Sequence, residues 1–381
     1  MSDDTLAKDT DVTVAPQRAG RHRSGPSAAP AGGGGRDRYL DMLRCVALVR
    51  VVTYHAFVWP WLSLVFPSMG VMFALAGSLM ARSLDRPALS VLRGRLRRLL
   101  PPLWLFGAVI ALAMMLKGWA PEEHQVGRWW ARMLLWVVPV ADPPHSAWGF
   151  EATEILWYLR TYLWFVLLSP LLLWAFRRAP AAVLCLSAVP IVVFTTVWTV
   201  PEGQAGTVLL DLATYLACWM AGFAHRDGLL DRLRPALAVS CAALAMAVGG
   251  WWAFGHRVDG SYDLNEIPPA QAFWSVGFVL LLLRFRPRLD GPARIRALDR
   301  LVVVCNSRAI TIYLWHQTAL ILSVPAIDHL WHVRAFELSL PLGSMWFQFG
   351  VAWMLIAVAV ALFGWVEDLA AKREPRLLPS R

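Results

Sequence analysis

The sequence predicts an all-α integral membrane protein, a bundle of about ten transmembrane helices with both termini cytoplasmic. Hydrophobic residues make up 57% of the 381 positions and charged residues only 16%. A soluble globular chain of this length has a lower hydrophobic share and a higher charged share. Apolar runs recur along the chain, each close to the roughly 20 residues that a helix needs to cross a bilayer. The 21 Trp residues fit the same class, because indole rings favour the headgroup level.

On that template the apolar runs predict ten spans. They cover 39–59, 62–81, 99–116, 155–175, 181–199, 208–224, 236–254, 270–283, 301–323 and 344–366. The stretch from Trp129 to Val140 is apolar but too short to cross, so we expect an interfacial or re-entrant helix there. Any chemistry then has to be built from helix interiors and short loops.

The distribution of Lys and Arg indicates the orientation of the bundle. Ten crossings put both termini on one side of the membrane. If that side is the cytoplasm, most of the 36 Lys and Arg residues lie in inner segments. The outer loops then hold only Lys117, Arg128, Arg132, Arg257 and Arg334. We therefore expect a multi-pass protein of the plasma membrane with cytoplasmic termini.

The chain divides into three predicted parts. Residues 1–38 are rich in Gly, Ala, Pro, Asp and Arg and cannot bury enough surface to fold, so we expect a disordered cytoplasmic tail. Residues 39–366 form the transmembrane domain, and 367–381 form a second cytoplasmic tail. The first apolar run is too long for the h-region of a secretory signal, so we expect it to stay as a span.

Composition also argues against two classes of site. The net charge of +10 does not indicate nucleic-acid binding, because the Lys and Arg residues lie between apolar runs and not along one solvated face. The five cysteines lie inside apolar segments without CxxC or metal-ligand spacing, so we expect no metal site. They are Cys45, Cys185, Cys218, Cys241 and Cys305.

Ionisable side chains at membrane depth are the functional candidates, since each one is costly there without a partner or a polar cavity. In the first span, His55 follows Arg44 by eleven positions, so both face one side of the helix roughly 16 Å apart. Asp41 lies one turn before Arg44 and can pair with it. The alternative is that Arg44 snorkels to the inner surface and His55 is interfacial. Arg50 points to the opposite side of the helix, towards an unidentified partner.

Two further candidates fall at the same predicted depth. His316 lies 15 residues from Leu301 and His55 lies 16 residues from Tyr39, so both imidazoles rise roughly 22–24 Å from the inner side. Arg160 enters the fourth span from outside and falls in the same layer. These positions predict a hollow lined by two imidazoles and a guanidinium. The alternative for His316 and Arg160 is a packing role with hydrogen bonds across the bundle.

An arginine cluster follows the second span. It consists of Arg93, Arg95, Arg97 and Arg98. One interpretation is ordinary positive-inside charge with anionic-lipid contact. The other is a phosphate site, because guanidinium groups match phosphate oxygens in two-point hydrogen bonds.

Together these motifs resemble the acyltransferase 3 family of multi-pass membrane O-acyltransferases. The matching segments, which span about 40 to 320, are Leu40–Arg44 with Tyr54 and His55, Gly70–Gly77 with Phe73, the arginine-rich 93–98, Leu156–Leu159 and Ile312–His316. Two positions depart from the family pattern. Ala76 stands where many relatives have serine, and Tyr162 stands where a glutamate is often found, so no glutamate role is carried over.

The resemblance implies transfer of an acyl group, most often acetyl, from cytoplasmic acyl-CoA to a hydroxyl of a sugar, a cell-envelope glycan or a glycosylated or macrolide-like metabolite. Acyl-CoA is the expected co-substrate and no metal is expected. The inner arginines would hold the CoA phosphates while the thioester arm runs past Arg44. His55 would be the general base or a transient acyl carrier. Arg160 or His316 would stabilise the oxyanion.

Two other classes stay open from the sequence. A transporter or flippase of a lipid-linked glycan would also need intramembrane Arg and His around a polar cavity, although no inverted repeat is visible. A binding or scaffold protein with decayed chemistry is disfavoured by the intact Arg44 and His55.

Overall fold

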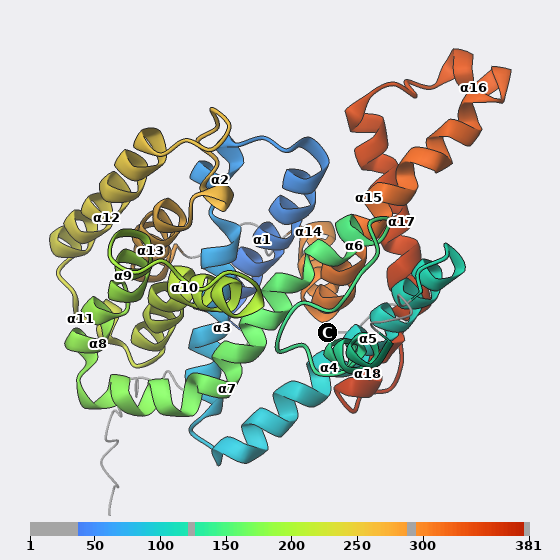
Figure 1. The fold of residues 1–381 in the computed structure, drawn as a ribbon. Coiled ribbons are helices and arrows are strands. Elements are labelled where there is room, and N and C mark those ends of the chain that lie inside the picture. Colours follow the sequence, from blue (N-terminus) through green and yellow to red (C-terminus); the bar gives the residue numbers. More distant parts are fainter. Residues whose placement is uncertain (1–36, 121–125, 288–294, 377–381) are drawn as a thin grey trace, which may run out of the picture. The chain divides into compact units, whose positions relative to one another are not determined.

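Helices make up nearly all the regular structure of the computed structural model, which describes residues 37–120, 126–287 and 295–376 (Figure 1). Within these ranges there is no strand, only an isolated bridge between Val258 and Ser261. The predicted all-α class is therefore confirmed. The predicted disordered tail lies outside the described residues except for its last two, where Asp37 caps the first helix and Arg38 begins it.

The helices connect directly or through short loops. In chain order the described residues form α1 Arg38–Phe57, α2 Trp61–Val65, α3 Ser68–Ser83, α4 Ala88–Leu116, α5 Val126–Met133, α6 Phe150–Glu154, α7 Leu156–Arg178, α8 Pro180–Leu186, α9 Val189–Thr196, α10 Gln204–Arg226, α11 Leu229–Arg232, α12 Pro235–Gly255, α13 Pro268–Arg284, α14 Arg296–Ser307, α15 Ala309–Trp331, α16 Arg334–Ser339, α17 Met345–Phe363 and α18 Trp365–Ala370. Two 3₁₀ turns, Leu134–Trp136 and Leu264–Glu266, complete the set.

Seven helical segments among the described residues are long and apolar enough to cross a membrane. They are Trp61–Ser83, Ala88–Leu116, Phe150–Arg178, Gln204–Arg226, Pro235–Gly255, Ala309–Trp331 and Met345–Phe363. A multi-span membrane protein is thus supported, but the count of ten is not confirmed. The other three predicted spans do form helices. However, α1 carries several charged side chains, α13 has 17 residues, and 181–199 is divided between α8 and α9.

The start predicted for the ninth span, Leu301, is wrong. The helix α14 ends at Ser307 and a new helix, α15, begins at Ala309. Arg308 lies at the junction, where its side chain donates to the carbonyl of Gly364 at 3.0 Å and to Asp368 at 2.6 Å. The N–H of Thr311, in the first turn of α15, donates to the Glu367 carboxylate at 2.6 Å. Contacts with α18 therefore hold this helix boundary in place.

Small residues let the central helices approach closely. A side-chain carbon at Gly222 of α10 would collide with the carbonyl of Ala74 in α3, and one at Gly277 of α13 would lie 2.6 Å from the carbonyl of Ala242 in α12. Close backbone packing of this kind is typical of membrane helices, which gain little from the hydrophobic effect when they associate. These contacts hold α3 against α10 and α12 against α13, and α1 and α7 pack against α3 (Figure 1).

The predicted interfacial stretch from Trp129 to Val140 contains the end of α5 and a 3₁₀ turn. Indole N–H groups hold the last residues of the stretch against the bundle. Trp104 donates to the carbonyl of Val137 at 2.8 Å, and Trp164 donates to that of Val140 at 2.9 Å. The stretch is too short to cross, as predicted, and its position at an interface stays a prediction.

Candidate active site

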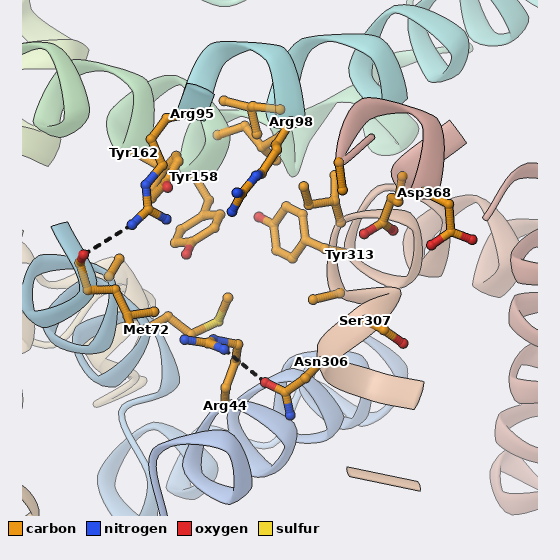
Figure 2. A pocket seen from close by; sticks show the side chains of 18 of the residues that line it. Arg44, Met72, Arg95, Arg98, Tyr158, Tyr162, Asn306, Ser307, Tyr313 and Asp368 are labelled. Atoms are coloured by element: carbon orange, nitrogen blue, oxygen red, sulfur yellow. Dashed lines mark hydrogen bonds between the residues drawn. The ribbon is translucent and has the colours of Figure 1, made fainter. Parts of the chain in front are cut away.

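A cavity of about 410 Å³ lies among α1, α3, α4, α7, α14, α15 and α18 (Figure 2). Its basic lining comes from four arginines, Arg44, Arg95, Arg98 and Arg373. Other polar side chains in the lining are Tyr158, Tyr162, Tyr313, Asn306, Ser307, Glu367 and Asp368. Helices far apart in the sequence thus bring guanidinium and phenol groups to one hollow.

Arg44 is held in the cavity wall by its neighbours. Its Nη1 donates to Oδ1 of Asn306 at 2.9 Å and lies 3.6 Å from Oδ1 of Asp41, the partner that the helical spacing predicted. The amide nitrogen of Asn306 donates in turn to the carbonyls of Asp41 and Val302, at 2.8 and 2.9 Å. This network fixes which end of the Asn306 side chain faces Arg44.

The arginine cluster of α4 divides between two faces of the helix. Arg95 lines the cavity, and its Nη2 donates to the carbonyl of Leu79 at 3.1 Å and to Ser83 at 2.9 Å. Arg98 also lines the cavity, whereas Arg93 and Arg97 do not. Positions 93 and 95 point roughly 200° apart on a helix, so they face opposite sides.

The electrostatic balance of the cavity is positive. Of its two carboxylates, Asp368 is bound to Arg308 outside the lining. Burial raises the pKa of Glu367 to about 7, against hydrogen bonds from Thr311 that lower it, so at neutral pH this carboxyl is partly protonated. Four guanidinium groups thus face a hollow with little opposing charge, which is an environment for an anionic ligand.

Tyr313 lines the cavity and contacts one of a pair of imidazoles. Its ring lies 5.0 Å from that of Tyr158 and 5.5 Å from that of His316, measured between ring centroids. Its hydroxyl donates to the carbonyl of Ile155 at 2.7 Å. The ring of His316 lies 5.1 Å from that of His55, so the structure brings the two predicted histidines together.

The hydrogen bond of His316 determines its tautomer. Nδ1 lies 2.5 Å from the carbonyl oxygen of Tyr313, which can only accept, so Nδ1 carries the hydrogen. In the neutral ring Nε2 then carries the lone pair. That atom is buried and has no hydrogen-bond partner among the described residues. His316 therefore presents a fixed proton acceptor beside the half-buried ring of His55.

The connection between α12 and α13 contacts the residue next to His55. The hydroxyl of Tyr54 donates to Asp263, in the connection between α12 and α13, at 2.7 Å. The guanidinium of Arg50 lies 5.0 Å from the centre of the Tyr54 ring. Arg50 also donates to Ser68 at 3.1 Å, so its previously unidentified partner lies at the start of α3.

Arg160 has partners other than those expected. It is buried, and its two terminal nitrogens donate to the carboxylates of Asp142 and Asp211. Tyr158, two residues earlier, faces the cavity, so Arg160 points to the opposite side of α7. Arg160 thus links α7 to α10 and to the loop that holds Asp142, and its predicted place beside the imidazoles stays a prediction.

Sequence reasoning missed several lining residues. Tyr158 belongs to a segment that matches the family pattern and Tyr162 was noted only as a departure from it, but neither carried an assigned role. The residues from Glu367 to Arg373 were placed in a tail. One signal was available for the second group. Arg308 falls inside the predicted span 301–323, where an arginine requires an acceptor, and Asp368 is a carboxylate just beyond the last apolar run.

Comparison with known families agrees with this geometry. The acyltransferase domain model of the acyltransferase 3 family matches residues 37–364, which is nearly the whole described part of the chain. No curated protein and no solved structure gives a significant match. The multi-span helical fold, the order of the motifs and the extent of this match lead to one conclusion: the chain belongs to the acyltransferase 3 family.

Proposed function

We propose that the protein is a plasma-membrane O-acyltransferase that moves an acyl group, with acetyl expected, from cytoplasmic acyl-CoA to a hydroxyl of a sugar, a cell-envelope glycan or a glycosylated metabolite. The observation that carries this proposal is the contact between the imidazole pair and Tyr313, which lines the arginine-rich cavity. A CoA thioester has anionic phosphates at one end and a reactive carbonyl at the other. The arginine-rich cavity suits the phosphates, and the imidazole pair suits the thioester carbonyl.

The donor end of the site suits phosphate groups. Arg44, Arg95 and Arg98 line one hollow, and guanidinium groups bind phosphate oxygens in two-point hydrogen bonds. The cavity volume of about 410 Å³ falls within the roughly 300–1,000 Å³ of small-molecule sites. Because Arg44 and Arg95 are already held by protein acceptors, they need little reorganisation on binding.

The reaction requires one proton to move from the acceptor to the leaving group. The acceptor hydroxyl attacks the thioester carbonyl, a C–O bond forms, the C–S bond breaks, and the hydroxyl proton passes through an imidazole to the thiolate to give CoA thiol. The free Nε2 of His316 suits this proton transfer. An N–H of His55 would then face the developing oxyanion. These roles exchange those that the sequence suggested for the two histidines.

Arg160 has no step in this scheme. Both of its terminal nitrogens are already bound by carboxylates, so a second acceptor would have to compete with two ion pairs. Arg93 and Arg97 are likewise left out of the donor site, since neither lines the cavity.

The test is transfer by the purified protein in phosphatidylcholine nanodiscs. With acetyl-CoA and a panel of sugars and glycosylated compounds, we expect thiol release that depends on an acceptor and yields an equal amount of acetyl ester. The matched control is His256→Ala, which changes an exposed histidine far along the chain from either imidazole. Acetyl-CoA binding without any acceptor-dependent thiol release above empty nanodiscs would contradict the proposal. Movement of a lipid-linked glycan across liposomes by such a protein would favour the flippase alternative.

A further inference from the structure

The segment that follows the last apolar helix forms one wall of the cavity. Four lining residues come from it: Glu367, Asp368, Ala371 and Arg373. The family match ends at residue 364, just before α18, and the sequence placed residues 367–381 in a tail. The cavity is therefore completed by a part of the chain outside the matched domain (Figure 2).

Several contacts dock this segment on the bundle. Arg308, which is 1% exposed, donates to Asp368 at 2.6 Å. Glu367 accepts from both the amide and the hydroxyl of Thr311, at 2.6 and 2.5 Å. On the side of α4, Arg97 donates to the carbonyl of Ala370 at 3.1 Å. With hydrogen-bond donors supplied from α4 and from the start of α15, α18 has a fixed place.

The turn after α18 directs Arg373 to the cavity. Lys372 has a left-handed backbone, with φ of 57°, and reverses the chain direction. The amide of Arg373 then donates to the carbonyl of Asp368 at 2.8 Å, which closes the turn. The side chain of Arg373 lines the cavity while that of Lys372 does not.

Arg373 and Arg98 both line the cavity. In the described part of the chain neither guanidinium forms an ion pair with a carboxylate, although Asp368 is close, because Asp368 is bound to Arg308. Two unneutralised guanidinium groups lining one hollow repel each other, and an anion between them would remove that cost. The chemistry of this position is that of a phosphate-binding site.

We propose that Arg373 is a donor-binding residue that holds a phosphate of acyl-CoA together with Arg98. This inference rests on the proposed function, because it takes acyl-CoA as the anion in the cavity. Acyl-CoA carries phosphate groups in two places that Arg373 could bind, the 3′-phosphate of the ribose and the pyrophosphate bridge. The segment that the sequence assigned to a tail thus takes part in recognising the donor.

The test compares variants in which one of two neighbouring basic residues, Arg373 or Lys372, loses its charge. Binding of acetyl-CoA to protein in phosphatidylcholine nanodiscs is measured for wild type, Arg373→Gln, Lys372→Gln and Arg373→Lys. We expect Arg373→Gln to raise the Kd about tenfold, as loss of one charge-assisted hydrogen bond does. Lys372→Gln removes the same charge one residue away and should change the Kd by less than about twofold. Arg373→Lys should recover part of the affinity.

A second ligand, 3′-dephospho-acetyl-CoA, identifies which phosphate Arg373 contacts. If Arg373 contacts the 3′-phosphate, the difference between Arg373→Gln and wild type disappears with 3′-dephospho-acetyl-CoA. If it contacts the pyrophosphate, the difference persists with both ligands. Equal affinities of Arg373→Gln and Lys372→Gln for both ligands, with wild type still binding, would overturn this inference alone. A wild-type protein that binds neither ligand would overturn the proposed function and this inference with it.

Discussion

Breaking the buried ion pair between Arg308 and Asp368 should strongly destabilise the protein. The two side chains are 1% and 8% exposed, and their nitrogen and oxygen atoms lie 2.6 Å apart. Removing one charge of a buried pair costs about 3–5 kcal/mol, because the remaining charge is left without compensation. In Asp368→Asn an amide oxygen remains, and Arg308 keeps its hydrogen bond to the carbonyl of Gly364. We therefore expect a loss near the lower end, about 3 kcal/mol.

The assay is unfolding of the purified protein by heat or denaturant, with Glu374→Gln as the matched control. That control breaks the pair between Glu374 and Arg376, whose side chains are 86% and 54% exposed, so it should stay within about 0.5 kcal/mol of wild type. The double variant Arg308→Met with Asp368→Asn removes both charges and should lose less than Asp368→Asn alone. Equal losses for Asp368→Asn and Glu374→Gln would refute the reasoning from burial.

Three further predictions concern stability and donor binding. Burial raises the folded-state pKa of Glu367 from 4.5 to about 7, so the folded protein binds more protons than the unfolded chain in that window. Stability should therefore fall as pH rises from about 4.5 to about 7, and Glu367→Gln should flatten this dependence in melting curves. Gly222→Ala should cost about 1–3 kcal/mol through collision with the facing helix. The control Gly94→Ala, with open space around it, should leave melting unchanged or gain about 0.5–1 kcal/mol. Asn306→Leu releases Arg44 and should raise the Kd for acetyl-CoA about tenfold in a binding titration, with Ser344→Ala as an unaffected control.

Hydropathy and motif order predicted the fold class and the family because both are local properties of the sequence. The number of spans was harder to predict from the sequence. The apolar template treats α1 as a span although it carries Asp41, Arg44 and Arg50, and it treats 181–199 as one helix although it divides after Leu186. The break at Arg308 depends on acceptors in α18, about 60 residues later, so periodicity within the predicted span could not reveal it.

The candidate site was predictable in its composition but only in part in its geometry. A depth argument places a residue in a layer and says nothing about the direction of its side chain. It grouped His55, His316 and Arg160, but only the histidines meet, because α1 packs against α15. Because the structure shows that Tyr158 lines the cavity, the roughly 200° between Tyr158 and Arg160 directs Arg160 away from it. The wall formed by α18 required tertiary contacts that no local pattern encodes.

The most direct test of the central claim measures acetyl transfer from labelled acetyl-CoA in His316→Gln and His55→Gln at equal donor occupancy. We expect both variants to bind acetyl-CoA like wild type, since neither imidazole lines the cavity. His316→Gln removes the proton acceptor and should slow transfer about 10²–10⁴-fold. His55→Gln keeps an N–H donor and should lose less. Near-normal transfer by His316→Gln would contradict the account.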